Sequence, residues 1–285
     1  MKLYRTSYGI LVKYSDACYK IDEDWNMLIN HGNLYAYLLN ITHRAEKMIP
    51  TLAAQWLEKI VAPIGKQEVW AAGVTYLRSR EARMEESKPS GSADLYDRVY
   101  SAGRPELFFK ALPHRVAGHK EFVHIRRDSV WNVPEPELTL YINSKGEIQA
   151  YTAGNDMSSR SIEGENALYL PQAKVYERSA ALGPCLFVSP TPIALSTRIE
   201  MIIRRNAEEV YKDSVCIDRI RRSFTELATY MFRECDFPNG CFLMTGTCLV
   251  PPGELTLQEN DVVDISIDHI GTLSNTVRYK PNAGI

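Results

Sequence analysis

Three carboxylates and one lysine in the middle of the sequence have the types and the spacing to do chemistry. Glu135 and Glu137 lie two residues apart in "VPEPELTLYIN", and Asp156 follows in "YTAGND". Three ionised carboxylates in one place raise each other's pKa unless a cation lies among them. Because these ligands are hard oxygens without histidine or cysteine, the set indicates Mg²⁺, Mn²⁺ or Ca²⁺.

A β-hairpin is the element that must bring the carboxylates together. Side chains alternate along a strand, so Glu135 and Glu137 share one face, while Leu138 and Leu140 share the other, which faces the core. The turn "NSKG" then joins this strand to a return strand, "EIQAYTAGND".

The register of this hairpin decides which residues meet. We predict that Ile142 lies opposite Glu147, Glu137 opposite Thr152 and Glu135 opposite Gly154. Asp156 then lies one pleat further, on the same face as both glutamates, unless a bulge in the turn reverses that face.

A second interpretation of the same residues needs no metal. Charges on an edge strand deter aggregation, and an aspartate in "GNDMS" is typical of a turn. On spacing alone, this second interpretation is slightly favoured.

Lys174 stands among apolar and aromatic residues in "YLPQAKVY". A partly buried lysine has a lowered pKa and can act as a base. A lysine that extends its ammonium group to the surface along an apolar stem is the commoner case, so both interpretations stay open.

The composition is that of an ordinary globular protein. With 285 residues, of which 45% are hydrophobic, the chain can bury a large core in one large domain or two smaller ones. A net charge of −2 gives no field that would attract nucleic acid or an anionic membrane. The N-terminus has no apolar run long enough for a signal peptide or a membrane span, so we expect a cytoplasmic protein.

Two domains are predicted along the chain. Residues 1–66 predict a small α/β domain, with short strands followed by a helix in "HRAEKMIPTLAAQWLEKIVAP" that ends at Pro63. Residues 67–285 predict a β-rich domain, because alternating segments are separated by Gly, Pro and Asn turns. The polar stretch 85–103 predicts a long loop, of the kind that forms a lid or a binding loop.

One late segment, "DRIRRSFTELATYMFRE", predicts an amphipathic helix instead. Its apolar stripe consists of Ile220, Phe224, Leu227 and Met231. The three arginines beside the stripe are far more often a solvated face than a nucleic-acid patch, so we expect no nucleic-acid partner.

Several separated motifs resemble the fumarylacetoacetate hydrolase family over residues 67–285. In order, they are "AAGVTYLRSREARMEES", "ELFFKA", "VPEPELTLYIN", "YTAGNDMSSR", "LPQAKVYERSAALGP" and "MTGTCLVPPGELTLQENDVV". The resemblance implies a mixed, mainly β fold, a β-sandwich roll preceded by a small N-terminal α/β domain. It also implies assembly as a homodimer or a homotetramer.

The same resemblance gives the candidate residues roles. It implies that Glu135, Glu137 and Asp156 bind a divalent metal, usually Mg²⁺, and that Lys174 lies beside the substrate. Thr247 in "TGT" takes the place of a substrate-contacting residue, although the family's last glycine is replaced there. The resemblance thus reverses the preference for the interpretation without metal.

One departure from the family pattern concerns the reaction. Hydrolytic members commonly read G-x-N-Y-x-x-H, whereas this chain reads from Gly73 to Ser79, with serine in place of the histidine. A serine cannot replace an imidazole base near neutral pH. The segments "RPELFFKA" and "GENALYLPQAK" look most like the sugar-acid dehydratase branch, the 2-keto-3-deoxy-D-arabinonate type, in which Glu106 joins Lys174 at the reacting centre.

The resemblance therefore leads to a Mg²⁺-dependent lyase as the expected function. The metal polarises the ketone of a 2-keto acid, Lys174 and Glu106 exchange protons with it through an enolate, and 2,5-dioxopentanoate results. Arg78 and Ser79 are expected substrate contacts, although a surface salt bridge is an equal alternative for Arg78. Hydrolysis of a 2,4-diketo acid, decarboxylation, a non-catalytic 2-keto-acid sensor and a structural oligomer are the alternatives.

Overall fold

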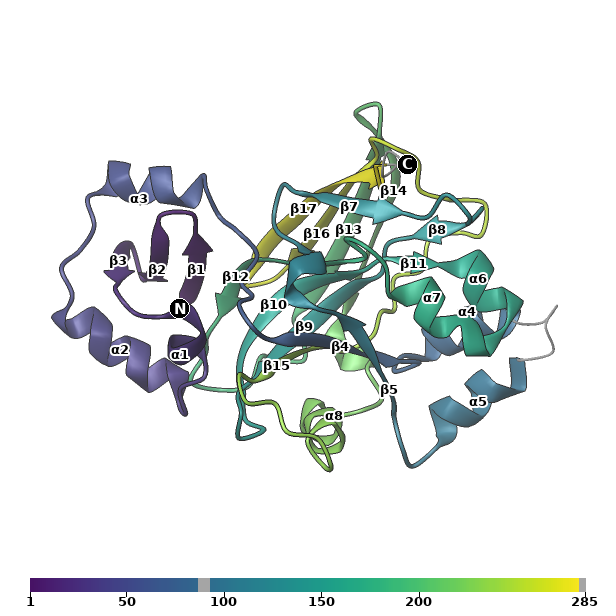
Figure 1. Ribbon diagram of the computed structural model, residues 1–285, viewed down its shortest axis with the longest axis horizontal. Coiled ribbons are helices and arrows are strands. Elements are labelled where there is room, and N and C mark those ends of the chain that lie inside the picture. Colours follow the sequence, from purple (N-terminus) through teal and green to yellow (C-terminus); the bar gives the residue numbers. More distant parts are fainter. Residues whose placement is uncertain (87–92, 282–285) are drawn as a thin grey trace.

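Two β-sheets packed face to face form the centre of the protein (Figure 1). The computed structural model describes residues 1–86 and 93–281. The larger sheet contains β1 (Lys2–Thr6), β2 (Gly9–Tyr14), β3 (Ala17–Ile21), β4 (Glu68–Gly73), β5 (Glu106–Ala111), β6 (Val116–Ala117), β9 (Pro136–Ile142), β10 (Ile148–Asp156), β12 (Ala180–Phe187) and β15 (Cys241–Met244). Its order is β3-β2-β1-β12-β10-β9-β15-β4-β5, with β6 beside β12.

The second sheet has the order β14-β13-β16-β17-β7. Its strands are β7 (Phe122–Ile125), β13 (Arg198–Arg205), β14 (Glu208–Cys216), β16 (Val262–Ile267) and β17 (Gly271–Tyr279). A small separate sheet pairs β8 (Asn132–Val133) with β11 (Ser158–Ser159). This strand-dominated, mixed α/β architecture confirms the predicted fold class.

The helices lie around the sheets (Figure 1). The α-helices are α1 (Trp25–Ile29), α2 (Leu34–Arg44), α3 (Pro50–Leu57), α4 (Leu77–Glu86), α5 (Ala93–Ser101), α6 (Arg160–Glu165), α7 (Leu170–Lys174) and α8 (Phe224–Met231). Single 3₁₀ turns are η1 (Pro113–Arg115), η2 (Ala167–Tyr169) and η3 (Ile217–Arg219). None of the helices within the described ranges is long and apolar enough to cross a membrane. The cytoplasmic location stays a prediction.

Strand β9 is buried on both faces, and its two faces belong to different cores. Leu138 and Leu140 pack in the core that also contains Met201 of the second sheet. Tyr141 packs on the other side, with Leu28 of the N-terminal helices. The predicted division of this strand into two faces is therefore confirmed.

The predicted register of the β9–β10 hairpin is wrong by two residues. Glu137 lies opposite Gly154, and Thr152 lies opposite Thr139. A register shift between Ile148 and Ala150 follows the turn. Because the total displacement is an even number of residues, the side chains keep their predicted faces.

The predicted helices and loops need three corrections. The segment before Pro63 contains the end of α2 and the separate helix α3 instead of one helix, because the backbone of Ala45 is extended. Helix α8 begins only after Ser223, whose side chain caps it by accepting from the backbone N–H of Glu226. The predicted loop 85–103 contains the end of α4 and helix α5, while 87–92 lie outside the described residues.

The N-terminal strands continue the larger sheet. Strand β1 pairs antiparallel with β12, so Leu3 lies opposite Leu186. Helices α1 to α3 gather around these strands on one side of the molecule (Figure 1). The domain boundary at residue 66 stays a prediction.

Candidate active site

The three predicted carboxylates come together at the open end of the β9–β10 hairpin. One oxygen atom from each of Glu135, Glu137 and Asp156 lies within 4.8 Å of the other two. The backbone N–H of Asp156 donates to the carbonyl oxygen of Glu135 at 2.9 Å, which closes this end of the hairpin. All three side chains are buried. The hairpin thus places three acidic groups in a space from which water is largely excluded.

The surroundings of Glu137 fit a cation. Burial, and then the negative charges of Asp156 and Glu135, raise the pKa of Glu137 well above its usual range. Its carboxylate accepts a hydrogen bond from the backbone N–H of Gly246 at 2.6 Å, and no cationic side chain among the described residues forms an ion pair with it. A divalent ion bound by oxygen ligands would supply the missing positive charge, and the all-oxygen set suits Mg²⁺.

Lys174 is the last residue of the short helix α7, and its ammonium group lies inside the protein. Its Nζ is 2.7 Å from Glu135 Oε2 and 3.0 Å from Asp156 Oδ2. It also donates to the hydroxyl of Ser158. The side chain is 1% exposed, so its ammonium group does not extend to the surface. The lysine predicted to be near the reacting centre therefore lies in direct contact with the acidic cluster.

Two further buried charges adjoin the cluster, and the sequence did not single them out. Arg160, the first residue of α6, pairs with Glu135 at 2.6 Å. Glu163, one turn later, lies 3.6 Å from the Nζ of Lys174. Arg160 ends the quoted segment "YTAGNDMSSR", four residues after Asp156, and this closeness in sequence was the available signal.

Glu106 lies at the start of β5, the strand that pairs with β4 at the end of the larger sheet. It lies opposite Gly73 in the pairing of β4 with β5. A Cβ atom placed on Gly73 would lie 2.0 Å from Oε2 of Glu106, so the carboxylate packs directly on the glycine. Gly73 itself lines the cavity among the carboxylates, as does Phe108, whose ring centre is 5.8 Å from the Nζ of Lys174. Glu106 thus packs behind Gly73 and is not itself among the residues that line the cavity.

Replacing Gly73 by alanine is expected to displace the carboxylate of Glu106. A misplacement of about 1 Å at a reacting group costs roughly 10²-fold in rate, so kcat should fall by about that factor. The affinity for Mg²⁺ should change little, because the atoms nearest to the added Cβ belong to Glu106, which is not a proposed metal ligand. Steady-state rates and calorimetric metal titration check this result. Gly103→Ala is the matched control, because a Cβ atom added to Gly103 would meet no atom within 4 Å. An equal loss of rate in both variants would contradict the proposed role of Glu106.

Of the three predicted substrate contacts, two are buried and one is exposed. Ser79 and Thr247 are buried and line the cavity of the carboxylates. The hydroxyl of Ser79 also donates to the carbonyl oxygen of Tyr76 at 2.8 Å. Arg78 lies outside this cavity: it is largely exposed, and its guanidinium is 3.6 Å from Asp213. The surface salt bridge that was the alternative for Arg78 is thus present.

The cavity among the carboxylates is small, about 20 Å³. That volume holds one ion or one water molecule. A much larger cavity of about 880 Å³ begins at the neighbouring residues Tyr76, Arg78 and Cys248. The small cavity alone therefore has no room for a substrate larger than an ion.

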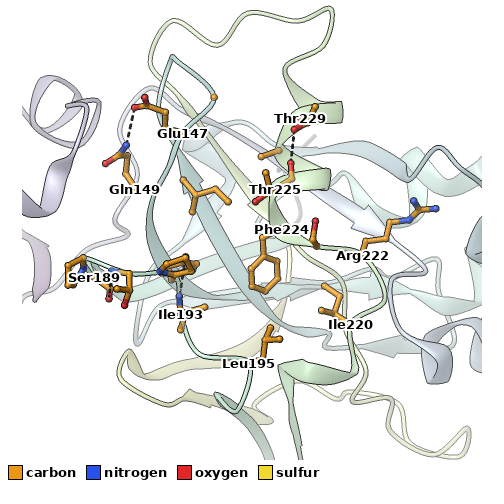
Figure 2. Close-up of a pocket in the computed structure, with 18 residues that line it drawn as sticks. Glu147, Gln149, Ser189, Ile193, Leu195, Ile220, Arg222, Phe224, Thr225 and Thr229 are labelled. Atoms are coloured by element: carbon orange, nitrogen blue, oxygen red, sulfur yellow. Dashed lines mark hydrogen bonds between the residues drawn. The ribbon is translucent and has the colours of Figure 1, made fainter.

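A separate cavity of about 540 Å³ lies against helix α8 and the start of β10 (Figure 2). Leu195, Ile220 and Phe224 form part of its lining, and Glu147 and Gln149 are hydrogen-bonded at its edge. None of the three clustered carboxylates lines it. The acidic site is thus distinct from this cavity against helix α8.

Comparison with known proteins places the chain in a family. Residues 96–278, more than half of the chain, match the family described as "Fumarylacetoacetate (FAA) hydrolase C-terminal". The "Probable 2-keto-3-deoxyxylonate dehydratase" of Haloferax volcanii is 49% identical over 217 residues, which cover 75% of this chain and 73% of that protein. The "2-dehydro-3-deoxy-D-arabinonate dehydratase" of Saccharolobus solfataricus is 40% identical over 227 residues, covering 78% and 75%.

Solved structures give the same result. A "2-keto-3-deoxy-D-arabinonate dehydratase apo form" is 31% identical, superposes with a TM-score of 0.84, and the match covers 99% of this chain and 100% of that one. The same dehydratase "complexed with magnesium and 2,5-dioxopentanoate" has a TM-score of 0.83, with coverage of 98% and 99%. The chain belongs to the fumarylacetoacetate hydrolase family, and within it, like the dehydratases that it resembles, it is an enzyme of the lyase class.

Proposed function

We propose that this protein dehydrates a 2-keto-3-deoxy sugar acid of the 2-keto-3-deoxy-D-arabinonate type to 2,5-dioxopentanoate with the help of Mg²⁺. The observation that carries the proposal is the buried ammonium of Lys174 in contact with Glu135 and Asp156. Both named relatives above 30% identity are dehydratases, and Ser79 stands where hydrolytic members have a histidine. These facts favour dehydration over hydrolysis.

Glu135, Glu137 and Asp156 would hold the cation. Their oxygens lie close together and within reach of a single ion. When bound there, Mg²⁺ would act as a Lewis acid on the keto group and so make the neighbouring C3–H more acidic. Mn²⁺ or Ca²⁺ are alternatives with the same oxygen preference.

Lys174 and Glu106 form the proposed acid/base pair. One of them removes the proton from C3, and the other gives a proton to the hydroxyl that leaves from C4. The C3–C4 double bond forms as the C4–O bond breaks, and water is released. The unsaturated product then tautomerises to the 2-keto aldehyde. We assign the pair and not the order of its roles.

The walls of the site would orient the substrate. Ser79 and Thr247 line the cavity and can contact the polar groups of the acid. Arg78 stands further out, beside the larger cavity, where it can attract the carboxylate. Burial of Lys174 and the carboxylates excludes bulk water, which strengthens each electrostatic contact with the substrate.

Product analysis by mass spectrometry tests the proposal. The purified protein with Mg²⁺ is given a panel of 2-keto-3-deoxy sugar acids and 2,4-diketo acids. Loss of one water from a sugar acid, abolished by EDTA, is the expected outcome. Addition of water with C–C cleavage would make the protein a hydrolase. Metal-dependent binding without turnover of any compound would favour a sensor, and no metal dependence at all would favour a structural role.

A further inference from the structure

A second lysine, Lys110, is fully buried behind the carboxylate cluster. Its Nζ lies 2.5 Å from Oδ1 of Asp156. It also donates to two backbone carbonyl oxygens, of Met157 at 2.9 Å and of Lys174 at 2.6 Å. The ammonium group thus donates hydrogen bonds to two carbonyl oxygens and forms an ion pair with the carboxylate of Asp156. Lys110 is neither a proposed metal ligand nor a member of the acid/base pair.

An irregularity in strand β5 directs Lys110 inward. In the pairing with β4, Trp70 lies opposite Phe109 and Val69 lies opposite Ala111, so Lys110 has no partner in the ladder. A bulge of this kind redirects a side chain and is common beside active sites. The same strand begins with Glu106. The strand thus carries both Glu106, of the proposed acid/base pair, and Lys110.

The contacts of Lys110 restrict two residues that the proposed function uses. Holding Oδ1 of Asp156 fixes the rotation of that carboxylate, while Oδ2 faces Lys174 at 3.0 Å. The carbonyl oxygen of Lys174 accepts hydrogen bonds from Lys110 and, at 2.9 Å, from the hydroxyl of Ser179. These two bonds fix the end of helix α7. This helix has five residues and lacks a side-chain cap at its start, so such tertiary contacts are needed to hold it in place.

We propose that Lys110 is a positioning residue, which sets the orientation of Asp156 for the divalent cation and the location of Lys174 for proton transfer. The second half of this statement rests on the proposed function. The first half concerns metal binding alone. Partners that orient a metal ligand typically change metal affinity or activity by 10–100-fold when they are replaced.

Charge neutralisation alone would give the opposite result for metal binding. Lys110→Met removes a positive charge next to the metal ligands, so charge alone predicts tighter binding of a cation. Loss of orientation predicts weaker binding. The sign of the change therefore distinguishes a positioning residue from a simple counter-ion.

Calorimetric titration with Mg²⁺ in the absence of substrate is the test. We expect Lys110→Met to weaken the affinity by about 10–100-fold, with Lys145→Met, an exposed lysine in the β9–β10 turn, unchanged. Unchanged or tighter binding in Lys110→Met would overturn the proposal. Cooperative melting in EDTA verifies folding, and Lys110→Gln, which keeps an N–H donor to the carbonyl oxygens, replaces the methionine variant if that one does not fold.

Kinetics at saturating Mg²⁺ test the second half. We expect kcat of the folded Lys110 variant to fall by about 10-fold or more, with KM for the keto acid changed much less, because the substrate still meets the metal. Equal kcat in variant and wild type would overturn this half. If the wild type binds Mg²⁺ but dehydrates no sugar acid, the proposed function fails, while the metal titration still decides the role of Lys110 toward Asp156.

Discussion

Replacing Lys174 by methionine is expected to lower the rate of dehydration by about 10²–10⁴-fold at saturating Mg²⁺. The change removes an ammonium group that lies 2.7 Å from Glu135 and 3.0 Å from Asp156, and methionine fills a similar volume. Because the three carboxylates remain, the variant should still bind Mg²⁺. Initial rates, together with a calorimetric metal titration, check both parts.

Two features make this prediction specific. Because the rates are measured at saturating Mg²⁺ and metal binding is titrated separately, lost activity can be distinguished from lost metal. Lys145→Met in the exposed turn should keep full activity. A Lys174→Met variant that retains more than about a tenth of the wild-type kcat would contradict a role for this lysine in proton transfer.

Replacing Glu137 by glutamine is expected to have opposite effects with and without metal. In EDTA the variant should melt above the wild type, because glutamine removes a buried charge beside Glu135 and Asp156 and can still accept the hydrogen bond from Gly246. A gain of 1 kcal/mol raises the melting temperature by about 2–4 °C in a chain of this size. Differential scanning calorimetry measures it.

The pH dependence of the metal-free protein follows from the same group. Burial and neighbouring charges raise the pKa of Glu137 above its unfolded-state value of about 4.3. The folded state then binds the proton more tightly, so this group's stabilisation is fully present below about pH 4.3 and is lost as pH rises through the raised pKa. The difference in melting temperature between the variant and the wild type should therefore grow from acid to neutral pH in EDTA.

Addition of Mg²⁺ should reverse the order of the two proteins. A ligand at 100 times its Kd stabilises the folded state by about 2.7 kcal/mol, and the wild type should gain this stability. The Glu137→Gln variant lacks one charged ligand and should gain far less, and its activity should be lost. If Mg²⁺ raises the melting temperature of both proteins equally, Glu137 is not a ligand.

The local chemistry of the hairpin could be predicted from the sequence, but its register could not. Alternation alone places Glu135 and Glu137 on one face of a strand and Leu138 on the other. The pairing depends on the conformation of the turn and on the shift between Ile148 and Ala150, which no residue pattern in the turn indicates. The faces were correct because the error was an even number of residues.

The partners of the cluster could not be predicted, for a different reason. Lys110 and Arg160 are long charged side chains of a kind usually found at the surface. Their burial depends on acceptors from other elements, such as Asp156 and the carbonyl oxygen of Lys174 for Lys110. Contacts between segments so distant in the sequence become visible only when the sheets and α7 are assembled.

The metal-dependent dehydration is tested by following 2-keto-3-deoxy-D-arabinonate by mass spectrometry, with Mg²⁺ and with EDTA. We expect loss of one water to give 2,5-dioxopentanoate with Mg²⁺, no change with EDTA, and no product from the Lys174→Met variant in either buffer. Product formation in EDTA, or C–C cleavage in place of water loss, would contradict a dehydratase that depends on a metal and on Lys174.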